Sequence, residues 1–151
     1  MERLVADLRA EALRLGLQEL KIAGVVPSAH TSTYRDWIRK GFHGEMGYLE
    51  RPDAVARRQE LGRTMEDVAS VVVVAQDYFQ PDPPGVPEDP SRGVIARSAR
   101  GEDYHTVLKD RFQELLSWIR EEARARDPTH EVRGFAYVDT GPILERELGA
   151  K

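Results

Sequence analysis

Apolar residues recur at helical spacing in two stretches of the chain, and each stretch predicts an amphipathic helix. The second stretch, residues 103–125, predicts the longest helix of the chain. This helix is expected to end before Asp127-Pro128, because the residue before a proline disfavours helical backbone. In the first stretch, residues 1–17, the apolar positions are Leu4, Val5, Leu8, Ala12 and Leu15. In the second stretch they are Tyr104, Val107, Leu108, Phe112, Leu115, Leu116 and Ile119, opposite a charged face.

Three further stretches predict strands. Residues 18–26 and 131–138 mix apolar and β-branched residues between turn signals. Residues 69–75 are apolar and mostly β-branched apart from Ser70, which is typical of a strand buried on both faces. We therefore expect residues 69–75 to form a central strand, and residues 93–96 to form a short strand or an extended segment.

Shorter helices and one long loop fill the rest of the chain. Thr33 can cap a helix that ends at Gly41, and residues 54–61 suit a second short helix. Residues 79–92 contain five prolines, which predict a surface loop of extended character. Helices and strands mixed in this order predict one α+β or α/β domain with few strands over residues 1–151.

Composition and charge narrow the classes of protein that remain. The net charge of -4 argues against a general nucleic-acid binder, although a local basic patch is still compatible with such a partner. No apolar run approaches the roughly 20 residues that cross a bilayer. Residues 1–17 are charged throughout and lack the apolar core of a signal peptide. We therefore expect a cytoplasmic protein without membrane contact.

The most catalytic-looking position is Asp139, which follows the third predicted strand and precedes Gly141-Pro142. Ligands of α/β and α+β folds tend to bind at the rim of the sheet, where strands end. A carboxyl group that is partly desolvated there can hold a proton near neutral pH and act as a general acid. The alternative interpretation is structural: Asp139 caps the next helix, with Pro142 in its first turn.

The start of the long helix, Asp103-Tyr104-His105, also has two interpretations. Asp103 is a good helix cap, and the same helix start could lie beside a large cofactor.

Other chemistry finds no support in the sequence. The four histidines are scattered without the spacing of a zinc site, so we expect no metal on protein ligands. No phosphate-binding loop and no serine-nucleophile motif is present.

Three sequence blocks carry a resemblance to a known family. They are GFHGEMGYL at residues 41–49, IARSARGEDYH at residues 95–105 and VDTGPILERE at residues 138–147. Together and in this order they resemble epoxyqueuosine reductases, cobalamin-dependent iron–sulfur enzymes that complete queuosine on tRNA. The resemblance extends over nearly the whole chain and corresponds to the N-terminal part of such an enzyme.

The resemblance implies a fold and a reaction. The fold is a nitroreductase-like α+β sandwich with a small central sheet flanked by helices. Reduced cobalamin, bound base-off without its dimethylbenzimidazole ligand, would act on the epoxide of epoxyqueuosine in tRNA, which binds through the full-length protein. Asp139 is then the acid that protonates the departing epoxide oxygen.

The resemblance also implies cofactor contacts. The segment that contains Ala96 and Arg97 would approach the corrin ring, because alanine adds little bulk beside the backbone. Tyr104 and His105 at the start of the long helix would adjoin the same ring. Ser98 replaces the tyrosine that is common at its place in the family, which leaves the backbone contact as the expectation there.

Two other features keep two interpretations each. Of the Arg57-Arg58 pair, Arg57 is the expected corrinoid contact, with the register open by one residue; without the resemblance, these arginines indicate a solvated helix face. The first block is either a tight turn with Phe42, Met46 and Tyr48 in an aromatic cluster, or a glycine-rich lid over the cofactor or the modified base.

The chain contains no cysteine, so it cannot hold a ferredoxin-type iron–sulfur cluster through thiolates. The cysteine-rich segment that follows in the family is absent from it. We therefore expect a fragment of a longer enzyme that is inactive alone and whose electron donor is unknown. Three alternatives are a corrinoid-binding module without catalysis, a flavin-dependent reductase of nitroreductase-like fold, and a structural remnant that binds nothing.

Overall fold

The computed structural model describes residues 2–82, 84–85, 89–139 and 141–150. Over these residues the chain forms five α-helices, three short 3-10 helices and two strands. The chain divides into two compact units. Unit 1 combines Met1–Glu19 with Ala75–Val132, and unit 2 combines Leu20–Val74 with Arg133–Lys151.

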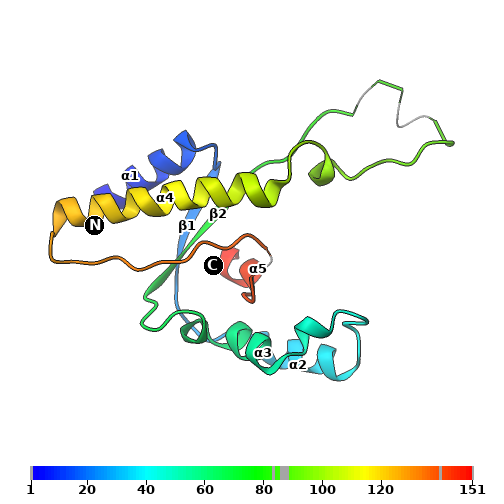
Figure 1. Cartoon of the computed structure of the whole chain (residues 1–151), viewed down its shortest axis with the longest axis horizontal. Helices are drawn as coiled ribbons and strands as arrows, with labels where there is room; N and C mark the ends of the chain where they lie inside the picture. The colour runs from blue at the N-terminus through cyan, green and yellow to red at the C-terminus, as the bar shows by residue number, and fades with distance from the viewer. Residues whose placement is uncertain (1, 83, 86–88, 140, 151) are drawn as a thin grey trace. The chain divides into compact units, whose positions relative to one another are not determined.

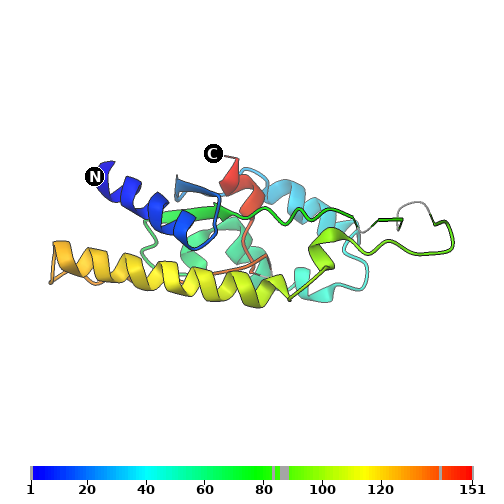
Figure 2. The same cartoon turned by 90° about the horizontal axis from the view of Figure 1, so that it is seen from above.

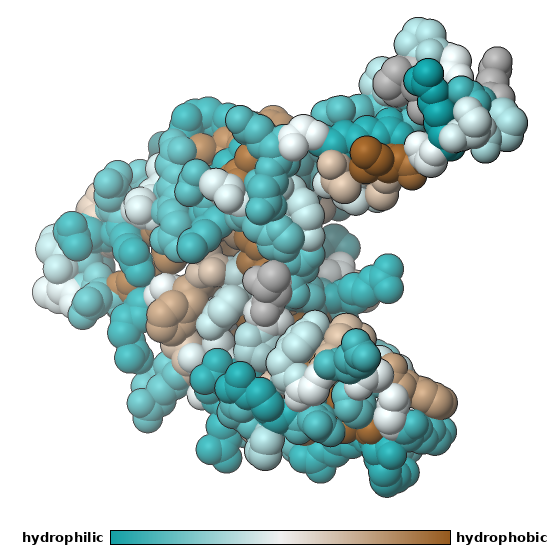
Figure 3. Space-filling model, turned by 45° about the vertical axis from the view of Figure 1, so that its right-hand side comes forward, coloured by the Kyte–Doolittle hydropathy of each residue, from teal (hydrophilic) through white to brown (hydrophobic). Residues whose placement is uncertain are grey.

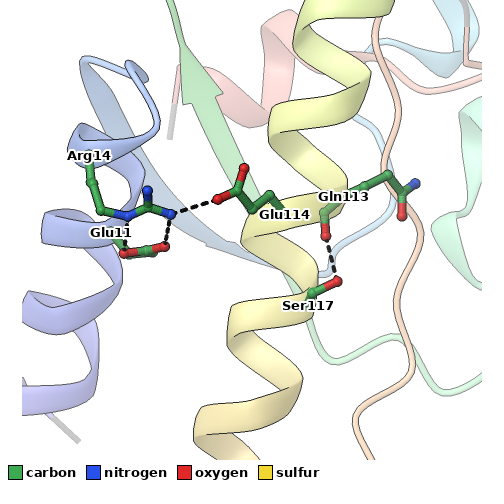
Figure 4. A network of polar contacts seen from close by, with 5 residues as sticks. All are labelled: Glu11, Arg14, Gln113, Glu114 and Ser117. Carbon is green, nitrogen blue, oxygen red and sulfur yellow. Dashed lines mark hydrogen bonds and ion pairs between the residues drawn. The ribbon is translucent and has the colours of Figure 1, made fainter.

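Unit 1 is built on two helices that lie alongside each other, α1 (Glu2–Arg14) and α4 (Tyr104–Arg126) (Figures 1 and 2). Both were predicted from the helical spacing of apolar residues, and both predictions are confirmed. The Arg14 guanidinium lies 2.7 Å from a carboxylate oxygen of Glu114 on α4 and 2.7 Å from one of Glu11 on its own helix (Figure 4). The buried apolar side chains of this unit are Leu8, Ala12, Leu15, Leu17 and Leu115.

The end of α1 is fixed by Gly16, whose φ of +82° lies in the left-handed region that favours glycine. The Leu17 amide donates 2.9 Å to the Ala12 carbonyl and the Gly16 amide donates 2.9 Å to the Leu13 carbonyl, which completes a Schellman-type cap. A Cβ on Gly16 would stand 3.0 Å from the Arg111 guanidinium. This turn therefore brings Leu17 into the core of unit 1.

The proline-rich segment of unit 1 lies outside helices and strands wherever it is described, which confirms the predicted loop. Residues 93–96 form no strand either, and the short 3-10 helix η3 (Arg97–Ala99) follows them. Asp103 then caps α4, accepting a hydrogen bond of 3.0 Å from the His105 amide. The cap interpretation of Asp103 is thus confirmed.

Unit 2 contains nearly all of a two-stranded antiparallel sheet formed by β1 (Glu19–Gly24) and β2 (Ser70–Ala75). β2 was predicted to be a central strand buried on both faces, and this prediction is wrong. Its four valines are only half-buried and its ends are exposed. Within the described residues β2 pairs with β1 alone, and a sheet of two strands has no central strand.

Three α-helices accompany the sheet in unit 2: α2 (Thr31–Arg39), α3 (Pro52–Gln59) and α5 (Glu145–Gly149). α2 begins before Thr33, with His30 at the cap position, so the predicted Thr33 cap is wrong. Two short 3-10 helices, η1 (Gly47–Leu49) and η2 (Leu61–Arg63), flank α3 in sequence. The buried side chains of unit 2 are Leu20, Ala23, Ala54 and Leu148.

Residues 131–138 were predicted to form a third strand, and this prediction is wrong. The segment has the alternating exposure of an extended chain, with Phe135 and Tyr137 among its exposed side chains. It does not join the described sheet, which consists of β1 and β2. The apolar and β-branched residues of this segment therefore indicated an extended backbone and did not indicate a hydrogen-bonded ladder.

The α+β class is confirmed, whereas the nitroreductase-like arrangement stays a prediction. The view in Figure 3 shows a mostly hydrophilic surface with separate apolar patches. Among the described helices, none combines the length and the apolar character that crossing a membrane requires.

Candidate functional site

The six predicted site residues are divided between the two units. Asp139 and Arg57 belong to unit 2, whereas the other four belong to unit 1. Those four are Ala96, Arg97, Tyr104 and His105.

Asp139 is exposed and follows the extended segment of residues 131–138. It is the first residue of a turn, residues 139 and 141–144, that we call the Asp139 turn. The following helix, α5, begins only at Glu145 and has Leu144 at its cap position. The interpretation of Asp139 as a helix cap with Pro142 in the first helical turn is therefore wrong. The cap position of α5 belongs to Leu144, so capping is not the role of Asp139.

The Asp139 turn is tight because Gly141 is buried against an aromatic ring. A Cβ placed on Gly141 would stand 2.7 Å from Cδ1 and 3.0 Å from Cγ of Tyr137. Carbon atoms do not approach one another so closely, so any larger residue would displace the ring or the turn. Gly141 thus holds the chain close to Tyr137 directly after the candidate acid.

Asp139 shares its surroundings with Glu145 and Arg58. Desolvation raises the pKa of the Glu145 carboxyl group, and the negative charge of Asp139 raises it further. The Arg58 guanidinium acts in the opposite direction and lowers that pKa. The charges of Asp139 and Arg58 therefore both act on the Glu145 carboxyl group, an arrangement that suits acid–base chemistry.

Arg58 rather than Arg57 is the arginine of α3 that faces these groups. Its Nη1 donates 3.2 Å to the Ala54 carbonyl, and its guanidinium carbon lies 5.3 Å from the centre of the Tyr34 ring. Arg57 is half-buried and contributes to the field at Asp53 near the start of the same helix. The role predicted for Arg57 stays a prediction, and Arg58 joins the candidate site.

Glu147 on α5 is a functional candidate that the sequence analysis missed. Its carboxylate accepts hydrogen bonds from the Ser28 hydroxyl and, at 2.9 Å, from the Ala29 amide. The Nδ1 atom of His30 lies 3.2 Å from the same carboxylate. These hydrogen bonds, with that of Ser28 first, lower the pKa of Glu147 to about 2, so the group is ionised at neutral pH.

A small pocket in unit 2 lies between Arg58 and Glu147. Its lining includes Ser28, Arg58, Leu144, Glu147 and Leu148. The volume is about 20 Å³, which is enough for one water molecule and far too little for a corrin ring. The pocket is thus a place where water could bridge the polar groups, and it is not a cofactor cavity.

In unit 1, Arg97 and Arg100 converge on the carboxylate of Asp82. Each guanidinium lies 2.6 Å from one oxygen of Asp82. These hydrogen bonds, with that of Arg97 first, lower the pKa of Asp82, and the same contact raises the pKa of Arg97. Arg97 also lies over the Phe79 ring, with 4.9 Å between its guanidinium carbon and the ring centre. The predicted cofactor residue Arg97 is therefore held by a carboxylate and an aromatic ring.

The apolar side chains around this arginine pair are exposed. Tyr78, Phe79, Val94 and Ile95 each expose between 61% and 66% of their surface, and Ala96 is exposed as well. Large apolar side chains grouped in one part of the chain and open to solvent are typical of a binding surface. A flat and partly apolar ligand would find suitable contacts in this segment.

Tyr104 and His105 stack on each other at the start of α4, with 4.1 Å between the centres of their rings. The Nδ1 atom of His105 lies 2.8 Å from the Asp103 carboxylate. The side-chain and backbone hydrogen bonds to His105 lower the pKa of Asp103. The orientation of the His105 ring is therefore fixed by the residue that caps the helix.

The GFHGEMGYL block does not form the aromatic cluster that was one of its two interpretations. Phe42, Met46 and Tyr48 are exposed to 64%, 42% and 60%, so the predicted cluster is wrong. The predicted turn is confirmed, with the Gly44 amide donating 3.1 Å to the Gly41 carbonyl. His43 is the member that turns inward: its ring lies 6.1 Å from that of Trp37, and its side chain is 12% exposed. The lid interpretation of this block stays a prediction.

The comparison with known families agrees with the motifs. The family model described as "Epoxyqueuosine reductase QueG, DUF1730" matches residues 58–140, which is more than half of the chain. The chain belongs to this family. The matched region includes Arg58, the four candidate residues of unit 1 and Asp139; Glu147 lies beyond it.

Curated epoxyqueuosine reductases are similar over nearly the whole of this chain. The enzyme of Gloeobacter violaceus is 34% identical over 143 residues, which is 93% of this chain and 41% of the relative. The enzyme of Aliivibrio fischeri is 30% identical over 99% of this chain and 39% of its own length. The chain thus spans about two fifths of the curated relatives it matches. No solved structure matches it.

The lowered pKa of Glu147 predicts a pH-dependent contribution to stability. The folded-state pKa of about 2 lies below the ordinary value of 4.5, so the contribution is complete above about pH 4.5 and is lost as the pH falls toward 2. At pH 7, Glu147→Gln should lower the free energy of unfolding by about 2 kcal/mol, as expected for charge-assisted hydrogen bonds. Denaturant unfolding of both proteins between pH 2 and 7 measures this difference.

The control for this prediction is Glu114→Gln, which removes an exposed ion pair with Arg14 and should cost less than about 1 kcal/mol. A difference between the wild type and Glu147→Gln that stays constant from pH 7 to pH 2 would contradict the assignment of the lowered pKa to Glu147.

The close approach of Gly141 to Tyr137 predicts that Gly141→Ala destabilises the protein by about 1–3 kcal/mol, because the added methyl group overlaps the ring. Gly24→Ala is the matched control in the same unit, since a Cβ at Gly24 meets nothing within 4 Å. That control should be neutral or stabilising by up to about 1 kcal/mol. Equal free energies of unfolding for the two variants would show that the turn is not tight.

Proposed function

We propose that this chain is the part of an epoxyqueuosine reductase that binds cobalamin and supplies the catalytic acid, for the reduction of epoxyqueuosine to queuosine in tRNA. Membership of the family supports the reaction class. The observation that carries the proposal is the Asp139 turn, where a family-motif aspartate shares its surroundings with Glu145 and Arg58. We place this activity in the cytoplasm, on tRNA bound through the full-length protein.

The chemistry of the available residues fits a corrinoid. This cofactor is a flat macrocycle with apolar edges, peripheral amides and a phosphate. The exposed Val94, Ile95 and Ala96 offer apolar contacts close to the backbone, and Arg97 offers a donor for an amide or phosphate oxygen. In unit 2, Arg58 is a second guanidinium of the same kind. The residues of unit 1 would hold the cofactor in the proposed enzyme, with Tyr104 and His105 adjoining it.

The residues of the Asp139 turn would handle the protons of the reaction. Removal of the epoxide oxygen as water, leaving an alkene, consumes two electrons and two protons. The bound cobalamin would supply the reducing chemistry. Asp139 would donate a proton to the departing oxygen, and its neighbour Glu145, whose pKa is raised by desolvation, can hold a proton nearby. Arg58 would limit the repulsion between the two carboxylates when both are ionised.

The electrons must come from another part of the enzyme or from another protein, because this chain has no cysteine for a thiolate-bound cluster. We therefore assign the chain binding and proton transfer, and place electron delivery outside it.

Titration of the purified chain with cob(II)alamin, followed by electron paramagnetic resonance, tests the proposal. We expect saturable binding and a base-off spectrum. Arg58→Ala should weaken binding by about tenfold, the loss of one charge-assisted contact. Arg63→Ala, which removes an exposed arginine paired with Glu60, is the matched control and should bind like the wild type. No saturable change, or saturable binding of FMN instead, would contradict the proposed cofactor.

The reconstituted full-length protein, assayed with tRNA that contains epoxyqueuosine, separates binding from acid catalysis. Asp139→Asn should keep the affinity for cob(II)alamin and should form queuosine at least about 100-fold more slowly, the usual contribution of a general acid. Equal rates in the wild type and in Asp139→Asn would favour a corrinoid-binding module in which Asp139 has no role in the chemistry.

A further inference from the structure

We propose that Glu147 is a positioning residue, whose carboxylate fixes the Asp139 turn to the arginine-bearing helix α3 through the turn that precedes α2. The inference rests on the proposed function for the role of Asp139 as acid. It assigns a purpose to a partly buried carboxylate that lies outside the region matched by the family model. All the contacts that carry it lie within unit 2.

The first step is the attachment of α5 to residues 28–30, which we call the Ser28 turn. The Glu147 carboxylate accepts hydrogen bonds from the Ser28 hydroxyl and the Ala29 amide, and His30 Nδ1 lies 3.2 Å from it. The Glu147 side chain is only 11% exposed. A carboxylate removed from water to this extent is retained only where several donors satisfy it, and here the donors come from a segment distant in sequence.

The second step leads from the Ser28 turn to α3. The Ser28 amide donates 3.2 Å to the carbonyl of Gln59, the last residue of α3. Ser28 therefore bonds to α3 through its backbone and to α5 through its side chain. Arg58, the residue before Gln59, lines the small pocket together with Ser28 and Glu147.

The third step leads from α5 back to Asp139. α5 has five residues and cannot hold its place by length alone. Leu148 is buried, and Lys21 Nζ donates 3.4 Å to the Gly149 carbonyl. On the other side, Gly141 is packed against Tyr137. The Asp139 turn is thus fixed at both ends, by Gly141 and by the attachment of α5, so the position of its acid relative to Arg58 depends on Glu147.

A serine, a histidine and a carboxylate that lie together raise the question of nucleophilic catalysis. In a catalytic triad the histidine stands between the serine and the acid and takes the serine proton. Here the Ser28 hydroxyl donates directly to Glu147, and the His30 ring contacts the same carboxylate. Ser28 has no imidazole base in this arrangement, so the cluster serves to hold α5.

Carbon-13 NMR of the intact chain without cofactor tests the inference, by comparing the carboxyl resonance and backbone amide of Asp139 between variants. Glu147→Gln removes the charge and should shift the Asp139 signals. Glu147→Asp keeps the charge and should restore most of the wild-type positions. Ser28→Ala, which leaves the Ala29 donor in place, should produce a smaller shift in the same direction. Glu114→Gln, an exposed carboxylate of unit 1, should leave the Asp139 signals unchanged.

The methyl resonances of Leu115, in the core of unit 1, report whether each variant is folded. Unchanged Asp139 signals in folded Glu147→Gln would overturn the inference, as would a Glu147→Asp variant that deviates as far as Glu147→Gln. If Glu147→Gln does not fold, Ser28→Ala decides: a shifted Asp139 signal supports the inference and an unshifted one overturns it. Because no cofactor is present, this result is independent of whether the corrinoid binds.

Discussion

The candidate site of unit 2 depends on the hydrogen bonds that the ionised carboxylate of Glu147 accepts. Moving a carboxylate out of water costs several kcal/mol unless hydrogen bonds replace its hydration. At Glu147 the Ser28 hydroxyl and the Ala29 amide provide that replacement, and the lowered pKa of about 2 expresses their preference for the charged form. The five-residue helix α5 is thereby attached to the Ser28 turn, and through the Gln59 carbonyl to α3.

The VDTGPILERE block contains two glutamates, Glu145 and Glu147, whose surroundings move their pKa values in opposite directions. Glu147 is held ionised by hydrogen bonds, whereas partial desolvation and the charge of Asp139 raise the pKa of Glu145 toward the protonated form. Groups whose environments move their pKa values apart can divide structural and proton-transfer roles between them. The VDTGPILERE block would then contain the proposed acid, a neighbouring proton holder and the anchor of the turn.

Sequence reasoning succeeded where the information is local. The helical spacing of Leu8, Ala12 and Leu115 identified α1 and α4, and Asp103 was identified as a possible cap from its place before α4. It failed where the answer depends on distant partners. Residues 131–138 have the composition of a strand, yet whether a ladder forms depends on another segment.

The same distinction between local information and distant partners applies to the candidate site. Its residues in the three blocks could be read from the sequence, because a motif records residue types in order. The role of Glu147 could not, since its partner Ser28 is 119 positions away. Nor could the sequence choose between Arg57 and Arg58, because one residue rotates a side chain by about 100° around a helix, and the neighbours on that side decide.

The coupling free energy between Ser28 and Glu147 tests this account most directly. It is measured by a double-mutant cycle on the free energy of unfolding at pH 7, with Ser28→Ala, Glu147→Gln and the double variant. The account predicts a favourable coupling of about 1–2 kcal/mol, as for two groups that share a partly buried hydrogen bond. Effects that add to within about 0.3 kcal/mol would contradict it, because the two side chains would then contribute independently and Glu147 would not anchor the Asp139 turn.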